Sequence, residues 1–180
     1  MSTSSAPLFE TRTIDLGPVV VEYATDAGPR ILGYCRHGGQ QLFARLPTQV
    51  LQHPTIGEYR LLGGHRLWRA PEVPATTYAP DHGSAMGVTK TPDGLAITGV
   101  AESDGLTKTI RIKQRGEYTI VDHGLQNHGA EPITCAPWAI TQLVTGGSAY
   151  LPQTRSPVDA DGVLPNRRII CWPYTDLSHP

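Results

Sequence analysis

At 180 residues, the chain is long enough for one domain with a sizeable hydrophobic core and too short to argue for two. Its 15 basic and 16 acidic residues give a formal net charge of -1, which provides no basic patch for nucleic acid or an anionic membrane. Apolar runs extend over a few residues at most, so the sequence contains no transmembrane helix.

The cysteines and the N-terminus indicate a reducing compartment. Cys35, Cys135 and Cys171 are odd in number and form no CxxC motif, so we expect free thiols and no disulfide framework. Residues 1–8 lack the basic and apolar regions of a signal peptide, and we expect them to form a disordered leader. We therefore predict a cytoplasmic protein, whose oligomeric state the sequence does not specify.

Short strands are predicted in the first part of the chain, where apolar and β-branched segments are separated by turn residues. Because the connections are too short for a crossover helix, these strands should form an antiparallel meander. Residues 47–57 are predicted to be helical or irregular. The predicted strands are Thr11–Leu16, Val19–Ala24, Arg30–Tyr34 and Leu42–Arg45.

Clearer hairpin signals follow in the second half. Pro92–Asp93–Gly94 should turn the chain, because its Pro presets φ and its Gly accepts a positive φ. Ile110 and Ile112 alternate with polar residues, as is typical of a half-buried strand. We therefore predict an all-β fold, an antiparallel β-sandwich, as a single domain over residues 9–180. The predicted strands of this half are Ala85–Thr91, Leu95–Ala101, Leu106–Gln114, Tyr118–Asn127, Ile133–Val144 and Arg167–Trp172.

The segment Glu58–Gly83 has neither helical nor strand periodicity and is predicted to be a functional loop. The pair Gly63–Gly64 opens it, and three prolines stiffen it. Its side chains combine aromatic rings with groups that form several hydrogen bonds, a combination that favours contact with a ligand. These side chains are His65, Arg66, Trp68, Arg69, Glu72, Tyr78, Asp81 and His82.

The order of several motifs resembles the galactose mutarotase-like (aldose 1-epimerase) superfamily, in particular its uncharacterised bacterial members with a GGHRLW-type motif. The motifs are GGHRLWRAPE at 63–72, a strand that ends in Asn127, APWAIT at 136–141 and WPYTDL at 172–177. The resemblance covers about Leu8 to Leu177 and implies a β-supersandwich with a sugar site on the concave face of its larger sheet. The C-terminal residues do not resemble a finished edge strand, so we expect an incomplete or shortened version of this fold.

The resemblance also implies where catalytic groups should lie. Aldose ring opening needs a base and an acid at the same pyranose. A family histidine in a His-Gly-Gly context is echoed by Asp81–His82–Gly83, while the place of the second family histidine falls near Trp138. No glutamate follows Glu131, so the family's general base is missing. His65 and His82 are the candidate catalytic residues.

Sugar binding, unlike catalysis, does not require an acid and a base. A pyranose stacks its C–H face on aromatic rings, and its hydroxyls form hydrogen bonds with planar polar groups. We predict that Trp68 stacks on the sugar while Arg69 and Glu72 bind hydroxyls. As alternatives, the tryptophans fill the core, Arg69 and Glu72 form a surface ion pair, and His65 and His123 are hydrogen-bonded structural residues. The full set of candidate sugar-binding residues is Arg66, Trp68, Arg69, Glu72, Asp81, His123, Asn127 and Trp138.

We therefore predict a carbohydrate-binding protein whose partner is a small-molecule sugar and that uses no cofactor. One alternative is an aldose or sugar-phosphate epimerase with non-standard or missing acid and base residues, and another is a structural remnant without a ligand. A metal centre built from His65, His82, His123 and His128 is disfavoured, because the sequence has no His-x-His or His-x₃-His spacing. We predict no metal site.

Overall fold

The computed structural model describes residues 9–78, 87–148, 150, 159–163, 170–171 and 178. The chain divides into two compact units, Met1–Thr145 and Gly146–Pro180. In the second unit, the described residues include a turn in which the Gly162 N–H donates to the Asp159 carbonyl at 3.0 Å. Most of the predicted strand Arg167–Trp172 lies outside the described residues.

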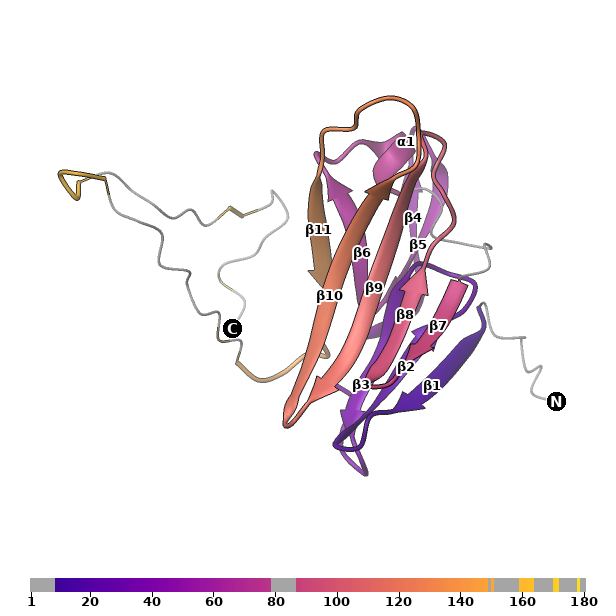
Figure 1. The fold of residues 1–180 in the computed structure, drawn as a ribbon, viewed down its shortest axis with the longest axis vertical. Helices are drawn as coiled ribbons and strands as arrows, with labels where there is room; N and C mark the ends of the chain where they lie inside the picture. The colour runs from indigo at the N-terminus through magenta and orange to yellow at the C-terminus, as the bar shows by residue number, and fades with distance from the viewer. Residues whose placement is uncertain are drawn as a thin grey trace. The chain divides into compact units, whose positions relative to one another are not determined.

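The first unit is an antiparallel sandwich, which confirms the predicted all-β class (Figure 1). Its larger sheet has the order β1-β2-β3-β6-β11, the smaller has the order β10-β9-β8-β7, and β4 and β5 form a separate hairpin. Helix α1 (Pro74–Thr77) is a single turn, and within the described residues no helix is long and apolar enough to cross a membrane. The strands are β1 (Thr11–Asp15), β2 (Val19–Ala24), β3 (Arg30–Arg36), β4 (Arg45–His53), β5 (Gly57–Gly63), β6 (His65–Ala70), β7 (Gly87–Thr91), β8 (Gly94–Thr98), β9 (Leu106–Arg115), β10 (Tyr118–Asn127) and β11 (Ala136–Thr141).

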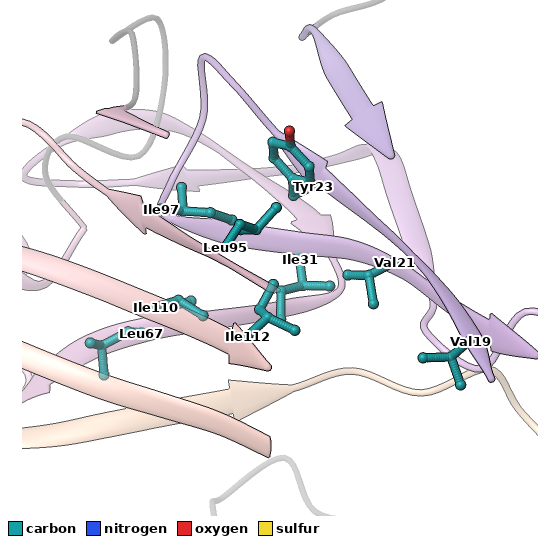
Figure 2. Close-up of a cluster of buried hydrophobic side chains, with 9 residues drawn as sticks. All are labelled: Val19, Val21, Tyr23, Ile31, Leu67, Leu95, Ile97, Ile110 and Ile112. Carbon is teal, nitrogen blue, oxygen red and sulfur yellow. The ribbon is translucent and has the colours of Figure 1, made fainter. Parts of the chain in front are cut away.

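The main hydrophobic core lies between the two sheets (Figure 2). Alternate residues of β2 point inward, and Ile110 and Ile112 of β9 face them while Arg111 between them is exposed, as the predicted alternation requires. Burying each of these aliphatic side chains stabilises the fold by about 1.5–3 kcal/mol relative to exposure. The core side chains are Val19, Val21, Tyr23, Ile31, Leu67, Leu95, Ile97, Ile110 and Ile112.

Two predictions for the middle of the chain are wrong. Residues 47–57 are neither helical nor irregular, because β4 and the start of β5 occupy most of this range. The predicted strand Leu42–Arg45 contributes only the bridge between Phe43 and Leu143 and the first residue of β4. The hairpin pairs only with itself and β4 is largely exposed, so no buried face imposes a hydrophobic alternation on the sequence of β4.

The prediction of a loop over Glu58–Gly83 is also wrong, since this segment contains β5, β6 and α1. Strand β6 has five buried residues out of six, so both of its faces are covered. Polar residues stand on both faces as well, which removes the period-two pattern that identifies a half-buried strand. Residues 79–83 of the predicted loop lie outside the described residues.

A left-handed turn carries the chain from the hairpin into the larger sheet. Leu62, Gly63 and Gly64 have φ values of 56°, 84° and 74°. A Cβ atom on Gly64 would lie 2.1 Å from the carbonyl oxygen of Ile31, so only glycine allows the backbone to approach β3 this closely. This turn places His65 and Arg66 at the start of a central strand.

Candidate functional site

The candidate site is built around β6, whose alternate residues point to opposite sides of the larger sheet. In the pairing with β11, Trp68 lies opposite Trp138 and His65 lies opposite Thr141. Leu67 belongs to the core, so His65 and Arg69, which share its parity, face the smaller sheet. Arg66 and Trp68 therefore face away from the smaller sheet, and the predicted site residues separate into two groups.

The outward group is centred on a stacked arginine and tryptophan. The Arg66 guanidinium carbon lies 4.1 Å from the Trp68 ring centroid, in cation–π geometry. Nη1 of Arg66 donates to Oε1 of Gln142 at 2.9 Å and lies 3.5 Å from the Leu61 carbonyl oxygen. Arg66 and Trp68 are each only 4% exposed.

Three more aromatic rings surround Trp68. The ring centroids of Tyr59, Tyr78 and Trp138 lie 5.9, 4.7 and 5.7 Å from that of Trp68, each at a steep interplanar angle. Such edge-to-face packing suits the quadrupoles of the rings. Trp138 is partly exposed, whereas Trp68 and Tyr59 are buried. We call this set, Arg66, Trp68, Trp138, Gln142, Tyr59 and Tyr78, the arginine–tryptophan face.

Glu72 lies at the edge of this face, where its carboxylate accepts a hydrogen bond from the hydroxyl of Tyr78. Four predicted sugar-binding residues, Arg66, Trp68, Glu72 and Trp138, are thus brought together. The sequence-based set omitted Tyr59 of β5 and Gln142, the residue after β11, which join the face only through tertiary contacts.

Arg30 was also missed by sequence reasoning. It lies opposite Arg66 in the pairing of β3 with β6 and is 0% exposed. Its Nη1 donates to the carbonyl oxygens of Leu61 and Gly63 at 3.0 and 2.8 Å, which fastens the left-handed turn beneath the arginine–tryptophan face. A charged residue beside the apolar run Ile31–Leu32 was the available signal.

Arg69 belongs to the inward group and does not share a surface with Trp68. It forms ion pairs with Glu102 at 3.2 Å and with Asp104 at 2.6 Å, and Lys108 lies 2.9 Å from Glu102. Burial raises the pKa of Glu102, against the lowering effect of both cations, and the hydrogen bond from Arg69 lowers the pKa of Asp104. The predicted role of Arg69 beside Trp68, and its alternative ion pair with Glu72, are both corrected: Arg69 is held in a buried ion cluster.

His65 and His123 meet between the sheets. Their Nε2 atoms are 2.7 Å apart, and Nδ1 of His65 lies 2.8 Å from the hydroxyl of Thr141. Burial, followed by the charges of His123 and Arg66, lowers the pKa of His65 to about 4. Burial also lowers the pKa of His123, which Asp122 partly opposes. Both rings are therefore neutral near pH 7.

The remaining candidates lie elsewhere. Asn127 accepts from the Gly129 N–H and donates to the Glu131 carbonyl, both at 2.8 Å, so it shapes the turn after β10. Asp81 and His82 lie outside the described residues. Among the residues that the structure describes, no three His, Cys, Asp or Glu side chains gather as a metal-binding cluster.

The two faces of β6 differ in what they can do chemically. The arginine–tryptophan face offers a partly exposed indole beside a guanidinium and an amide, which are groups for recognition. The inward face offers two neutral imidazoles at hydrogen-bond distance. A scan against family models and searches of curated proteins and solved structures found no match to this chain.

Proposed function

We propose that the protein binds a carbohydrate on the arginine–tryptophan face. The observation that carries this proposal is the Arg66 guanidinium stacked on Trp68 at 4.1 Å, next to the partly exposed ring of Trp138. A pyranose would stack its C–H face on Trp138, which is partly exposed and packs edge-to-face against the buried Trp68.

The polar groups around the rings suit sugar hydroxyls. The buried Arg66 donates to Gln142 at 2.9 Å, which fixes the half-buried Gln142 amide and reduces the entropy that this amide loses when it binds a ligand. Glu72 is exposed and is positioned by Tyr78, so its carboxylate can accept from a hydroxyl at the edge of the face. The resemblance to the galactose mutarotase-like superfamily supports the same ligand class.

Binding without catalysis fits this geometry best. His65, one of the two candidate catalytic residues, faces the smaller sheet and therefore cannot reach a sugar stacked on Trp138. The buried Arg69 is likewise turned away. In an optical-rotation assay with α-glucose and α-galactose, we expect no acceleration of mutarotation by the protein.

The binding experiment is isothermal titration of the full chain with neutral hexoses, uronic acids and sugar phosphates. For a sugar that binds, Trp138→Ala should raise Kd about tenfold, which corresponds to about 1.4 kcal/mol of lost stacking. Tyr118→Ala is the matched control, because Tyr118 is an aromatic residue 76% exposed on the other sheet. Absence of binding across the panel, or equal Kd values for Trp138→Ala and the wild type, would refute the proposal.

A further inference from the structure

The histidine pair between the sheets has no part in the proposed sugar site. His65 comes from β6 of the larger sheet and His123 from β10 of the smaller one, so their contact joins the two layers. Histidines 58 positions apart along the sequence are placed with their Nε2 atoms facing each other. Imidazole nitrogen is the side-chain donor most often used for transition metals.

We infer that His65 and His123 form a two-histidine binding site for a divalent transition metal such as Zn²⁺, with water completing the coordination. This inference is independent of the sugar proposal and differs from our expectation, drawn from sequence spacing alone, that the chain has no metal site. The pairing arises from two facing sheets, and a cross-sheet pair leaves no His-x-His or His-x₃-His signature.

The orientation of His65 suits a metal ligand. With its proton on Nδ1, the ring donates to the Thr141 hydroxyl at 2.8 Å and leaves the Nε2 lone pair directed at His123. Metal-binding histidines commonly donate their second N–H to such a partner, which fixes the tautomer.

Coordination requires small and balanced changes. When both Nε2 atoms bind the metal, the proton that the pair holds between its Nε2 atoms moves to Nδ1 of His123, so no net proton is lost. A tetrahedral Zn²⁺ with Zn–N distances of about 2.0–2.1 Å needs its two nitrogens about 3.3 Å apart. The observed 2.7 Å must therefore widen by about 0.6 Å, a shift available to a half-buried side chain such as His123.

Water can reach the proposed site through a neighbouring pocket. His65 and Thr141 line a pocket of about 360 Å³, whose walls include Phe43 and Val121 and whose polar groups include the hydroxyl of Thr119. Arg66 and Asp122, the sequence neighbours of His65 and His123, carry opposite charges. A largely apolar pocket with open space beside His65 leaves coordination positions for water or a small exogenous ligand.

The test is metal titration of the full chain after removal of metals with EDTA. ZnCl₂ at about 100 times its Kd should raise Tm by about 5–10 °C, and CoCl₂ should give the visible ligand-field bands of nitrogen coordination. His123→Gln should abolish both signals, and His65→Gln should do the same. The matched control is His37→Gln, which removes an exposed histidine paired with Asp15 at 3.1 Å and should leave both signals intact.

Three results would overturn the inference: no Tm shift and no cobalt bands in the wild type, signals that persist in His123→Gln, or signals lost in His37→Gln instead. Should His65→Gln fail to fold, His123→Gln still decides the matter, because His123 lies half-buried on an edge strand of the smaller sheet. Imidazole ¹⁵N spectra give a second readout. Zinc should move the Nε2 resonances of two histidines together, and unchanged resonances would count against the site.

Discussion

The left-handed turn before β6 gives a stability prediction with a matched control. Gly64 and Gly57 have φ values of 74° and 75°, so alanine suffers nearly the same backbone strain at both positions. That strain costs about 1–2 kcal/mol for a residue with a Cβ atom. The two positions differ in their surroundings. A Cβ on Gly64 would lie 2.1 Å from the Ile31 carbonyl oxygen, whereas a Cβ on Gly57 would meet nothing within 4 Å.

The additional cost of Gly64→Ala comes from the backbone. Carbonyl oxygen and Cβ need a separation more than 1 Å larger than 2.1 Å, so β3 and the turn must move apart in a packed sheet. Overpacking of this kind costs about 1–3 kcal/mol beyond the strain. We therefore expect Gly64→Ala to lower the free energy of unfolding by about 2–5 kcal/mol and Gly57→Ala by about 1–2 kcal/mol.

Urea denaturation followed by far-UV circular dichroism measures both values under identical conditions. The difference between the two variants is the informative quantity, because their shared φ strain cancels. If Gly57→Ala and Gly64→Ala destabilise equally, the close approach of the turn to β3 does not exist in solution. Lower destabilisation of Gly64→Ala than of Gly57→Ala would contradict the fold at this point.

Two further predictions concern ionisable side chains. Burial lowers the pKa of His65 to about 4 in the folded chain, whereas the same imidazole has a pKa of 6.5 in the unfolded chain. The folded chain therefore binds fewer protons at His65 than the unfolded chain does between these two pH values. The free energy of unfolding should therefore be unaffected by this group above pH 6.5 and should fall by about 3 kcal/mol as the pH decreases to about 4. In the presence of EDTA, His65→Gln should reduce the pH dependence of the free energy of unfolding, measured by urea denaturation between pH 6.5 and 4. If the variant and the wild type show the same pH dependence, the ring is not buried. Glu102→Gln should cost about 3–5 kcal/mol, because Arg69 and Lys108 stay buried beside a neutral amide. The control is Glu58→Gln, which removes an exposed ion pair and should lower the free energy of unfolding by less than about 1 kcal/mol. If Glu102→Gln and Glu58→Gln destabilise the protein equally, the ion pairs of Glu102 are exposed to solvent.

The sequence predicted the sandwich well where turns and alternation coincide. β2 and β10 have the predicted bounds, and the hairpin around Pro92–Asp93–Gly94 forms as expected, because each depends on local signals. The β4–β5 hairpin and β6 were missed for opposite reasons. Strand β4 is largely exposed and β6 is buried on both faces, so neither shows the one-sided pattern on which strand prediction depends.

That single error in β6 also determined which site residues were grouped wrongly. In a loop, His65, Arg66, Trp68 and Arg69 can all turn toward one ligand, and the sequence-based site treated them so. In a strand, parity assigns Arg66 and Trp68 to one face and His65 and Arg69 to the other. The partner Gln142 follows from the pairing of β6 with β11, and His123 follows from the packing of one sheet on the other; no local pattern specifies either contact.

The turn, the sugar face and the histidine pair depend on one another through β6. Arg30 donates to the carbonyls of Leu61 and Gly63, and Arg66 approaches the Leu61 carbonyl from the next strand, so two buried arginines contact the left-handed turn or the residue before it. Strained backbone persists only where its surroundings fix it. The left-handed turn in its place fixes the first residues of β6. Because side chains alternate along a strand, Arg66 then points outward to Trp68 and His65 points inward to His123. A single strand thus orients both proposed sites, and a shift of one residue in its register would exchange their side chains.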